Sequence, residues 1–358
     1  MLTVIMAGGS GTRFWPVSRR NRPKQFLNII GHYPMVVETC DRMQPLARDQ
    51  DMVIVLGQAH LYQARELFKG RKIHLLAEPT GRNTAPAMGL GAIYASHLGY
   101  EGAVAFLPAD HFIGKPSALL ECLRQAEEIA TAGAVVTLGI VPTRPETGYG
   151  YIQWSADRPD FWTLPAYRVT AFTEKPSLEK AKQYLVRGDY FWNSGIFVAT
   201  PRVILQQIED HLPNLYLGLK KVERYLGTDA FENVIEAVYA ELDSVSFDRG
   251  VMEKTKDPVF VIPCDCGWSD VGSWASLYDL REGECDKDRN IAEGECVLID
   301  CEGNFVSSRG GRLIACLGLR NCLVVDTRDA VLIADLERSQ EVRRVIEVLK
   351  RNRKEDLT

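Results

Sequence analysis

The first half of the chain alternates short apolar runs with segments whose apolar residues recur at helical spacing. The apolar runs are rich in Val, Ile and Leu and lack polar alternation, which is typical of parallel strands buried on both faces. The pattern therefore predicts a doubly wound α/β sheet with helices on both sides. Strands are expected at Leu2–Met6, Met52–Leu56, Ile73–Leu76, Ala103–Leu107 and Ala134–Ile140, and helices at Met35–Met43, Ala59–Phe68, Thr84–His97 and Ser117–Ala130.

The pattern changes in the second half of the chain. Aromatic and β-branched segments from Tyr149 to Glu174 predict an antiparallel insertion, after which helices are expected at Leu178–Arg187 and Arg202–Leu242. The polar run REGECDKDRN at 281–290 predicts a boundary between two domains, 1–280 and 281–358. The second of these is expected to be a small β domain closed by a helix. Its strands are expected at Val297–Asp300, Leu313–Cys316, Leu323–Asp326 and Ala330–Ala334, and its helix near Arg338–Asn352.

Composition narrows the class of protein. The chain has 358 residues, of which 46% are hydrophobic and 25% charged, as in globular proteins with a sizeable core. Its net charge of −5 argues against nucleic acid as a partner, because such binding depends on distributed neutralisation of phosphates. The opening Leu2–Met6 is too short for a signal peptide and no apolar run is long enough to cross a bilayer, so we expect a cytoplasmic protein with no membrane partner. Its nine cysteines are expected to be reduced thiols.

The amino-terminal stretch from Met1 to Val37 contains no Asp or Glu. Its AGGSGTR segment follows a predicted strand, and a glycine-rich turn there can place backbone N–H groups around an anion. The segment lacks the Gly-Lys-Ser/Thr ending of a Walker A loop, and its next acidic residue, Glu38, is too distant for a dinucleotide-binding turn. A bound polyphosphate would explain both the missing carboxylates, which would repel it, and the accompanying cations. These cations are Arg13, Arg19, Arg20, Arg22 and Lys24.

The segment GGSGTRFWPVSRRNRPKQF is similar, nearly residue for residue, to the signature of the sugar-1-phosphate nucleotidylyltransferases. Its FWPVSR and PKQF pieces resemble the mannose-1-phosphate guanylyltransferase (GDP-mannose pyrophosphorylase) branch of that family. The tail LVVDTRDAVLIADLERSQEVRRVIEVLK also resembles the family, so the resemblance covers nearly the whole chain. Between them, matching blocks follow in order: EPTGRNTAPA at 78–87, LPADH at 107–111, TGYGYI at 147–152, FTEKP at 172–176, WNSGIF at 192–197, FDRGVMEK at 247–254 and GWSDVGSW at 267–274.

This resemblance implies a Rossmann-like doubly wound mixed sheet of the nucleotide-diphospho-sugar transferase type, with a small C-terminal β domain and a terminal helix. It implies an enzyme that transfers GMP from GTP to mannose-1-phosphate, giving GDP-mannose and pyrophosphate, with Mg²⁺ or another divalent cation as cofactor. By the same resemblance, the β domain could carry the contact of a homodimer. Longer relatives continue into a cupin-type isomerase domain. Because this chain stops after the predicted helix at 338–352, we expect no second activity of that kind.

The resemblance also implies three groups of site residues. For the nucleotide they are Ala7, Gly8, Gly9, Ser10, Gly11, Thr12, Arg13, Glu78, Asn83 and Thr84. For the sugar phosphate they are Tyr149, Gly150, Glu174, Lys175, Asn193 and Gly195. The catalytic set is Arg13, Lys24, Asp110 and Asp270, of which the two aspartates would bind the metal. Magnesium favours one or two carboxylates together with substrate phosphates, so a site of two aspartates is chemically sound.

Some of these residues keep two interpretations. Asn83 could read or flank the guanine, or it could only cap the helix that begins near Thr84. Arg19, Arg20 and Arg22 could contact phosphate directly or form a solvated basic rim.

Two other functions remain open at this stage. An enzyme of the same family could use another sugar phosphate or another nucleotide, because the sequence does not reveal how mannose is distinguished from its epimers. A catalytically silent sensor of sugar nucleotides could dispense with the four residues of the catalytic set. All four are present, which favours chemistry.

Overall fold

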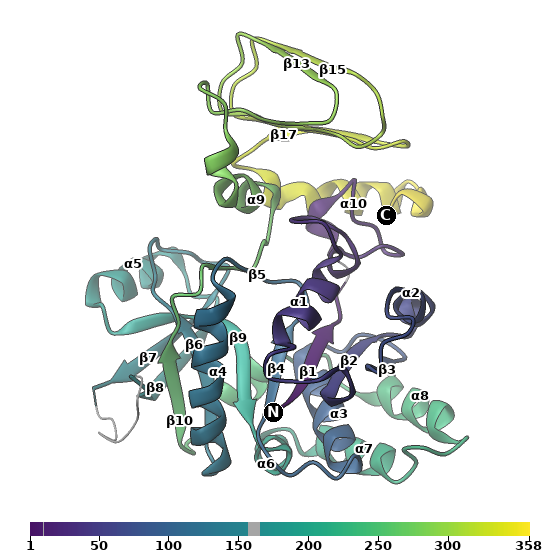
Figure 1. Cartoon of the computed structure of the whole chain (residues 1–358), viewed down its shortest axis with the longest axis vertical. Helices are drawn as coiled ribbons and strands as arrows, with labels where there is room; N and C mark the ends of the chain where they lie inside the picture. Colours follow the sequence, from purple (N-terminus) through teal and green to yellow (C-terminus); the bar gives the residue numbers. More distant parts are fainter. Residues whose placement is uncertain (10, 157–164) are drawn as a thin grey trace. The chain divides into compact units, whose positions relative to one another are not determined.

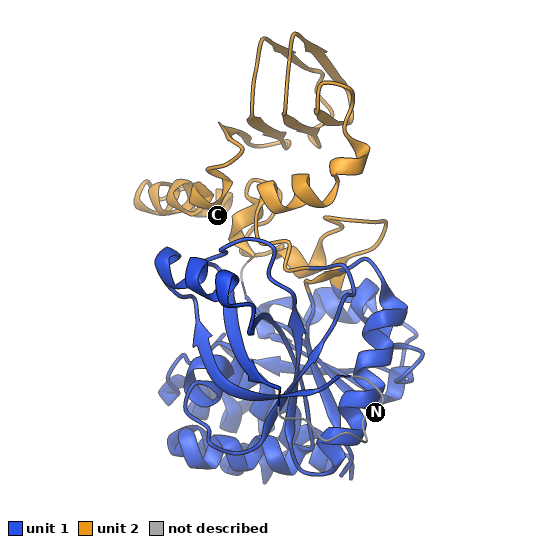
Figure 2. Ribbon diagram, turned by 90° about the vertical axis from the view of Figure 1, so that its left-hand side faces the viewer, with its two compact units in different colours: residues 1–9, 36–109, 113–268 blue, residues 10–35, 110–112, 269–358 orange. Residues whose placement is uncertain are grey.

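The computed structural model describes residues 1–9, 11–156 and 165–358, which form two compact units (Figure 2). Unit 1 comprises Met1–Gly9, Val36–Ala109 and Ile113–Trp268, and unit 2 comprises Ser10–Met35, Asp110–Phe112 and Ser269–Thr358. The predicted division into 1–280 and 281–358 differs from these units. The segments 10–35, 110–112 and 269–280, which the sequence assigns to the first domain, cluster with the C-terminal segment instead.

Unit 1 is built on a mixed sheet, which has nine strands within the described ranges, in the order β3-β2-β1-β4-β9-β6-β10-β8-β7 (Figure 1). The first four of these strands are mutually parallel, and β10 is parallel to β6. β9 joins these two groups, because it pairs antiparallel with β4 and with β6. The predicted α/β fold with a mixed sheet is therefore confirmed. The strands are β1 (Leu2–Ala7), β2 (Met52–Gly57), β3 (His74–Glu78), β4 (Val104–Pro108), β6 (Val135–Ile140), β7 (Gly150–Ser155), β8 (Tyr167–Glu174), β9 (Tyr190–Ala199) and β10 (Val259–Pro263).

The predicted helices are also present, with one difference. The expected helix at 202–242 is three helices, because Pro213 has no N–H to continue a helix and begins a new one, and Gly227 adopts a positive φ of 77° between the second and third. No helix among the described residues has the length and apolar character needed to cross a membrane. The helices are α1 (Met35–Met43), α2 (Leu61–Leu67), α3 (Thr84–His97), α4 (Pro116–Thr131), α5 (Leu178–Arg187), α6 (Pro201–His211), α7 (Pro213–Glu223) and α8 (Phe231–Glu241).

The sheet brings two of the predicted motifs to one edge. β1 ends at Ala7, just before the glycine turn, and β3 ends at Glu78, the first residue of the EPTGRNTAPA block. Both strands are parallel to β2, whose Leu56 is in register with Ala7 and whose Gly57 is in register with Glu78. Because the carboxyl ends of parallel strands meet at one edge, where ligands collect in open α/β sheets, both motifs begin there.

Unit 2 contains a coil of short parallel strands that alternate between two sheets. β12, β14 and β16 are mutually parallel in one sheet, which β17 closes as an antiparallel edge, and β13 pairs in parallel with β15 in the other. The predicted small β domain with a terminal helix is confirmed, although the sequence pattern did not predict β12 and β14. The elements are α9 (Trp274–Leu280), β12 (Ile291–Glu293), β13 (Cys296–Ile299), β14 (Phe305–Ser308), β15 (Ile314–Leu317), β16 (Cys322–Asp326), β17 (Val331–Asp335) and α10 (Val342–Arg351), and the two-residue strands β5 (Phe112–Ile113) and β11 (Trp268–Ser269) complete the chain.

The hydrophobic core of unit 2 explains why these separate segments of the chain cluster together. Phe14 and Trp274 are both fully buried, with ring centroids 5.0 Å apart, and Trp274 lies 5.5 Å from the ring of Phe305. One hydrophobic cluster therefore joins the segment that follows the glycine turn to α9 and to the β coil. Apolar burial of this kind is the main stabilising term in folding, so these segments are expected to order together.

In unit 1, a glycine allows α3 to approach β1 closely. A Cβ atom built on Gly91 of α3 would lie 2.6 Å from Cγ1 of Val4, which is fully buried in β1. Alanine at this helical position would gain about 1 kcal/mol of helix propensity but would overpack a stiff β-branched neighbour at a cost of about 1–3 kcal/mol. We expect Gly91→Ala to lower the urea midpoint of unfolding.

The matched control is Gly283→Ala, where a Cβ would meet no atom within 4 Å. If Gly91→Ala is as stable as the wild type while Gly283→Ala is neutral, the close approach of α3 to β1 is not a constraint on the fold.

Candidate active site

The glycine turn after β1 needs backbone conformations that favour glycine. Gly9 has a φ of 89° and Gly11 a φ of 55°, both in the left-handed region, while the predicted contact residue Ser10 lies outside the described residues. Gly11 is also crowded, since a Cβ there would lie 2.5 Å from the backbone nitrogen of Lys24. Its carbonyl accepts a hydrogen bond of 2.6 Å from the Ser18 hydroxyl. Both the backbone conformation of Gly11 and its close packing against Lys24 therefore favour a residue without a Cβ atom.

In unit 2, Lys24 joins two of the other predicted catalytic residues. Its ammonium donates to the backbone oxygen of Asp110 at 2.8 Å, to Oδ2 of Asp110 at 3.0 Å and to the backbone oxygen of Asp270 at 2.6 Å. An ammonium has three N–H donors, so these oxygens satisfy it although the residue is only 4% exposed. Lys24, Asp110 and Asp270, which are far apart in the sequence, are therefore brought together. The resemblance implied this for the two aspartates but not for the lysine.

The two aspartates differ in their surroundings. Burial acts to raise the pKa of Asp110, but the charges of Lys24 and His111 and the hydrogen bond from Lys24 hold it below its usual value. Asp110 is therefore ionised at neutral pH. Asp270 lies in a turn in which its Oδ1 accepts a hydrogen bond of 3.1 Å from the Gly272 N–H. Within the described part of the chain, no cluster of three or more His, Cys, Asp or Glu side chains could hold a metal ion by itself.

The other cations of the acid-free stretch have different neighbours. Arg13 follows Thr12 in a short 3₁₀ turn. Burial of the Arg343 guanidinium on α10 lowers its pKa, and the positive charge of Arg13 lowers it further. Arg19 is buried and forms an ion pair of 2.9 Å with Asp329, and its guanidinium also donates to the backbone oxygen of Leu357. For Arg19, the contacts are therefore those of a residue that holds unit 2 together.

In unit 1, the predicted base loop surrounds a buried carboxyl group. Glu78 is 2% exposed, and its Oε1 accepts a hydrogen bond of 3.1 Å from the Tyr239 hydroxyl. Burial raises the pKa of Glu78 to about 7, against the opposing effect of that hydrogen bond. A Cβ on Gly8 would lie 3.9 Å from Oε2 of Glu78, so the glycine turn and the base loop come together at the edge of the sheet.

The two residues that follow in this loop are tied to the backbone. Asn83 has a φ of 72°, and its Oδ1 accepts a hydrogen bond of 2.9 Å from the Thr84 N–H. It therefore caps α3, as one of its two interpretations expected. The Thr84 hydroxyl accepts a hydrogen bond of 2.9 Å from the Phe247 N–H. A contact of either residue with guanine stays a prediction.

The six predicted sugar-phosphate residues lie on, or directly next to, the neighbouring strands β7, β8 and β9 of unit 1. Gly150 on β7 is in register with Glu174 on β8, and a Cβ on Gly150 would lie 2.7 Å from Oε2 of Glu174 and 3.2 Å from Cβ of Asn193 on β9. Lys175 pairs with Glu174 through its ammonium. Gly195 donates its N–H to Oδ1 of Asn193 at 3.0 Å, and the Tyr149 ring meets the rings of Trp192 and Trp268, each at 5.2 Å between centroids.

Two further carboxylates contact this group. Oδ1 of Asp248 accepts a hydrogen bond of 2.8 Å from Nδ2 of Asn193, and Oε1 of Glu253 accepts one of 2.8 Å from the Glu174 N–H. The sequence analysis assigned no role to either residue. The available signal was the FDRGVMEK block, which matched the family but carries no pattern that indicates what its carboxylates contact.

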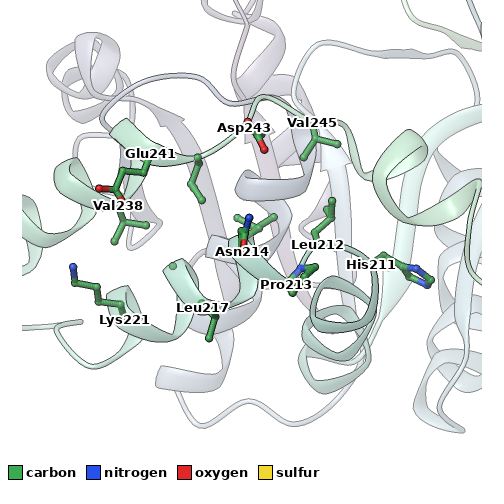
Figure 3. Close-up of a pocket in the computed structure, with 13 residues that line it drawn as sticks. His211, Leu212, Pro213, Asn214, Leu217, Lys221, Val238, Glu241, Asp243 and Val245 are labelled. Atoms are coloured by element: carbon green, nitrogen blue, oxygen red, sulfur yellow. The ribbon is translucent and has the colours of Figure 1, made fainter.

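A separate cavity of about 580 Å³ lies in unit 1 between α7, α8 and the segment 242–245 (Figure 3). Figure 3 shows Leu217 and Lys221 of α7 and Glu241 of α8 around it. Its described lining includes none of the predicted site residues. The same elements brace the base loop, because the Arg82 guanidinium donates to the backbone oxygen of Tyr239 at 2.9 Å at the end of α8.

The close contact between Gly11 and Lys24 can be tested by adding a methyl group. In Gly11→Ala the new Cβ would meet the backbone of Lys24, which cannot move aside as a flexible side chain can, and the positive φ would add strain. We expect a loss of stability of about 2 kcal/mol or more, measured as a lower melting temperature. Gly9→Ala is the control, because Gly9 also has a positive φ, of 89°, but no atom lies within 4 Å of the added Cβ. Equal losses in the two variants would mean that strain alone, without the contact to Lys24, limits position 11.

Comparison with known proteins places these features in a family. A family model described as nucleotidyl transferase matches residues 2–287, and one described as a MannoseP isomerase/GMP-like beta-helix domain matches residues 294–349. A mannose-1-phosphate guanylyltransferase of Klebsiella pneumoniae is 38% identical over 360 residues, which cover 99% of this chain and 75% of that protein. One of Escherichia coli is 38% identical and covers the same shares.

Solved structures agree with these matches. A crystal structure from Thermus thermophilus, described as a mannose-1-phosphate geranyltransferase, is 36% identical, with a TM-score of 0.86 over 98% of this chain and 99% of that one. A structure of a mannose-6-phosphate isomerase from Helicobacter pylori shares the fold, with 24% identity and a TM-score of 0.60 over 75% of this chain and 100% of that one. The chain therefore belongs to the nucleotidyl transferase family, and within it to the group of enzymes that includes these mannose-1-phosphate guanylyltransferases.

Proposed function

We propose that this enzyme transfers GMP from GTP to mannose-1-phosphate, with GDP-mannose and pyrophosphate as products. The names of the relatives that match 99% of this chain support this substrate pair. The observation that carries the proposal is the buried ammonium of Lys24, which donates hydrogen bonds to Asp110 and Asp270. Lys24 belongs to the acid-free stretch that contains the glycine turn.

In this reaction a phosphate oxygen of mannose-1-phosphate attacks the α-phosphorus of GTP. A new P–O bond forms, and the bond from the α-phosphorus to the oxygen that bridges to the β-phosphate breaks, so pyrophosphate leaves with that electron pair. A phosphate monoester has a second pKa of about 6 and is largely ionised at neutral pH, so the attacking oxygen needs no strong general base. The main obstacle is to bring two polyanions into line.

The groups of the acid-free stretch are suited to that obstacle. The positive φ values at Gly9 and Gly11 allow backbone N–H groups to turn toward an anion. We assign Arg13 and Lys24 to the negative charge that builds up on the α-phosphate and on the departing pyrophosphate. Arginine offers a planar fork for two phosphate oxygens, and lysine offers a compact charge.

Asp110 and Asp270 are the residues that would hold a divalent cation. The donor set fits magnesium, because both side chains offer carboxylate oxygens and Mg²⁺ commonly takes one or two carboxylates together with substrate phosphates and water. The lowered pKa of Asp110 keeps that carboxylate ionised and able to bind a cation at neutral pH. When bound, the cation would supply positive charge to the phosphates of the nucleotide.

The two groups of residues on unit 1 are assigned to the guanine and to the sugar. A carboxylate at Glu78 can accept hydrogen bonds from two neighbouring donors, which guanine presents on one edge. Glu174 and Asn193 can bind sugar hydroxyls. Gly150 keeps the space next to them open, because a Cβ there would lie 2.7 Å from Oε2 of Glu174 and 3.2 Å from Cβ of Asn193. We assign Lys175 to the phosphate of the sugar.

The test of the proposed function is pyrophosphate release across a panel of sugar phosphates and nucleoside triphosphates. We expect GTP with mannose-1-phosphate to give the highest kcat/KM, and release to depend on a divalent cation. A preference for glucose-1-phosphate with UTP or dTTP would overturn the substrate assignment. Tight binding of GDP-mannose without any turnover would mean that the chain is a sensor.

The metal assignment can be tested separately with Asp110→Asn and Asp270→Asn. Each change removes a negative oxygen ligand, so we expect kcat to fall by about a hundredfold or more with the circular dichroism spectrum retained. Asp265→Asn is a matched control, because Asp265 is exposed and pairs only with Lys115 among the described residues. Near-normal turnover in either test variant would remove that aspartate from the metal site.

The assignment of Glu78 predicts a pH dependence for GTP. The pKa of about 7 means that Glu78 becomes protonated as the pH falls below 7 and then can no longer accept two hydrogen bonds. We expect the KM for GTP to rise as the pH falls through this range. In Glu78→Gln we expect that KM to be about tenfold above the wild-type value at pH values above 7, where Glu78 is ionised, and to lose this component of the pH dependence.

The control for this prediction is Glu121→Gln, on the exposed face of α4. Ionisation of GTP itself is common to all variants, so the difference between the profiles of wild type and Glu78→Gln isolates the carboxyl group. An unchanged KM for GTP in Glu78→Gln would place the guanine elsewhere.

A further inference from the structure

The FDRGVMEK segment forms a short π-helix, Asp248–Met252, that lies against the end of β8. π-helical turns are rare and frequent at functional sites, so its contacts are informative. The two acidic side chains of the FDRGVMEK segment are Asp248, in the π-helix, and Glu253, directly after it. They contact residues on two different strands, Asn193 on β9 and Glu174 on β8. Both of those residues belong to the group that we assign to the sugar.

The contacts of Asn193 fix the direction of its amide. Nδ2 donates to Oδ1 of Asp248 at 2.8 Å, while Oδ1 accepts from the Gly195 N–H at 3.0 Å. Because the oxygen faces a backbone N–H, which can only donate, the nitrogen must face the carboxylate. Reversing the amide would set N–H against N–H and oxygen against oxygen. Asp248 therefore determines where the second N–H of Nδ2 points.

Glu253 has a comparable effect on the backbone next to Lys175. Its Oε1 accepts a hydrogen bond of 2.8 Å from the Glu174 backbone N–H, and the Lys175 backbone N–H donates to the backbone oxygen of Tyr149 at 3.2 Å. Lys175 has a φ of 54°, which is unfavourable for a residue with a side chain and persists only where the surroundings enforce it. These two hydrogen bonds supply that enforcement.

We infer that Asp248 is a positioning residue of the sugar-phosphate subsite, which acts through the amide of Asn193, with Glu253 holding the neighbouring backbone of Glu174 and Lys175. This inference rests on the proposed function, because the sugar-phosphate role of Asn193 belongs to it. Neither carboxylate needs to touch the substrate. Their effect is to give the contacting groups one orientation before the sugar arrives, which lowers the cost of ordering them on binding.

The charges around Asp248 provide a readout that a packing role would not give. Burial and the facing carboxylate of Glu174 raise the pKa of Asp248 to about 6, while the hydrogen bond from Asn193 and the charge of Lys175 oppose that rise. Asp248 is ionised above this pH and accepts a charge-assisted hydrogen bond from Asn193. As the pH falls through about 6 the carboxyl group becomes neutral and that hydrogen bond weakens.

The experiment measures kcat and the two KM values for Asp248→Ala and Asp248→Asn from about pH 5 to about pH 8. Alanine removes the acceptor, so we expect the KM for mannose-1-phosphate to rise about tenfold at neutral pH while the KM for GTP stays within about twofold. Asparagine keeps an oxygen acceptor but no charge, so we expect a smaller rise. The sugar phosphate titrates near the same pH, and this effect is common to all variants. The wild type should therefore show a component of the pH dependence that Asp248→Asn lacks.

Arg249→Ala is the control, because Arg249 is exposed on the same π-helix. If the KM for mannose-1-phosphate is unchanged in Asp248→Ala, or if both KM values rise equally, the inference is overturned. If Asp248→Ala does not fold, the pH profile of Asp248→Asn decides, and a profile that matches the wild type counts against a positioning role. Absence of wild-type turnover with mannose-1-phosphate contradicts the proposed function instead. The same comparison is then made with the sugar phosphate that the panel selects.

Discussion

The arrangement of unit 2 depends on the burial of one charge, the ammonium of Lys24. Placing a lysine ammonium away from water is costly unless each of its donors finds an acceptor. Here the three donors meet three oxygens, two from Asp110 and one from Asp270, and the Phe14 ring centroid lies 5.8 Å from the ammonium. Since removing any of these partners would leave a charge or a carbonyl unsatisfied, the two aspartate segments are held to the lysine and so to each other.

This constraint changes the meaning of the acid-free stretch. From the sequence, Arg13 and Lys24 were assigned to a polyphosphate, and Arg19 was expected either to contact phosphate or to lie on a solvated basic rim. In the structure, Lys24 is paired with Asp110 and Arg19 with Asp329, so two of the cations are neutralised by carboxylates from distant parts of the sequence. Because all three N–H donors of Lys24 are occupied, we expect it to act on a phosphate through its charge, from a position that its partners fix.

The sequence predicted β1 to β4 and β6 because runs such as Met52–Leu56 are apolar at every position, as strands buried on both faces must be. It did not predict β10, which is parallel to β6. It did not predict β9, because its sequence YFWNSGIFVA mixes polar and small residues with apolar ones. These residues form hydrogen bonds in the middle of the strand: the Ser194 hydroxyl donates to the Leu138 backbone oxygen, and the Gly195 N–H donates to Oδ1 of Asn193. The clustering of residues 10–35 with the C-terminal segment was not predicted, because the packing of Phe14 against Trp274 is a long-range contact that a composition change cannot reveal. Likewise, the resemblance supplied the residues that we assign to the sugar, but only the three-dimensional structure shows that Asp248 and Glu253 contact two of them.

Three carboxyl groups, Asp110 in unit 2 and Glu78 and Asp248 in unit 1, show how the neighbours of one type of group change its pKa. Lys24 keeps the pKa of Asp110 below its usual value, as a ligand for a cation requires, whereas burial raises the pKa of Glu78 to about 7 and that of Asp248 to about 6. For the latter two, the folded state binds a proton more readily than the unfolded state does. Their contribution to the free energy of unfolding therefore decreases as the pH rises from the ordinary carboxyl range to 7, so both oppose folding at neutral pH. A buried amide or apolar side chain would avoid this cost. That Glu78 is itself assigned to the guanine, and that Asp248 contacts the assigned Asn193, supports the view that they are kept for recognition and not for stability.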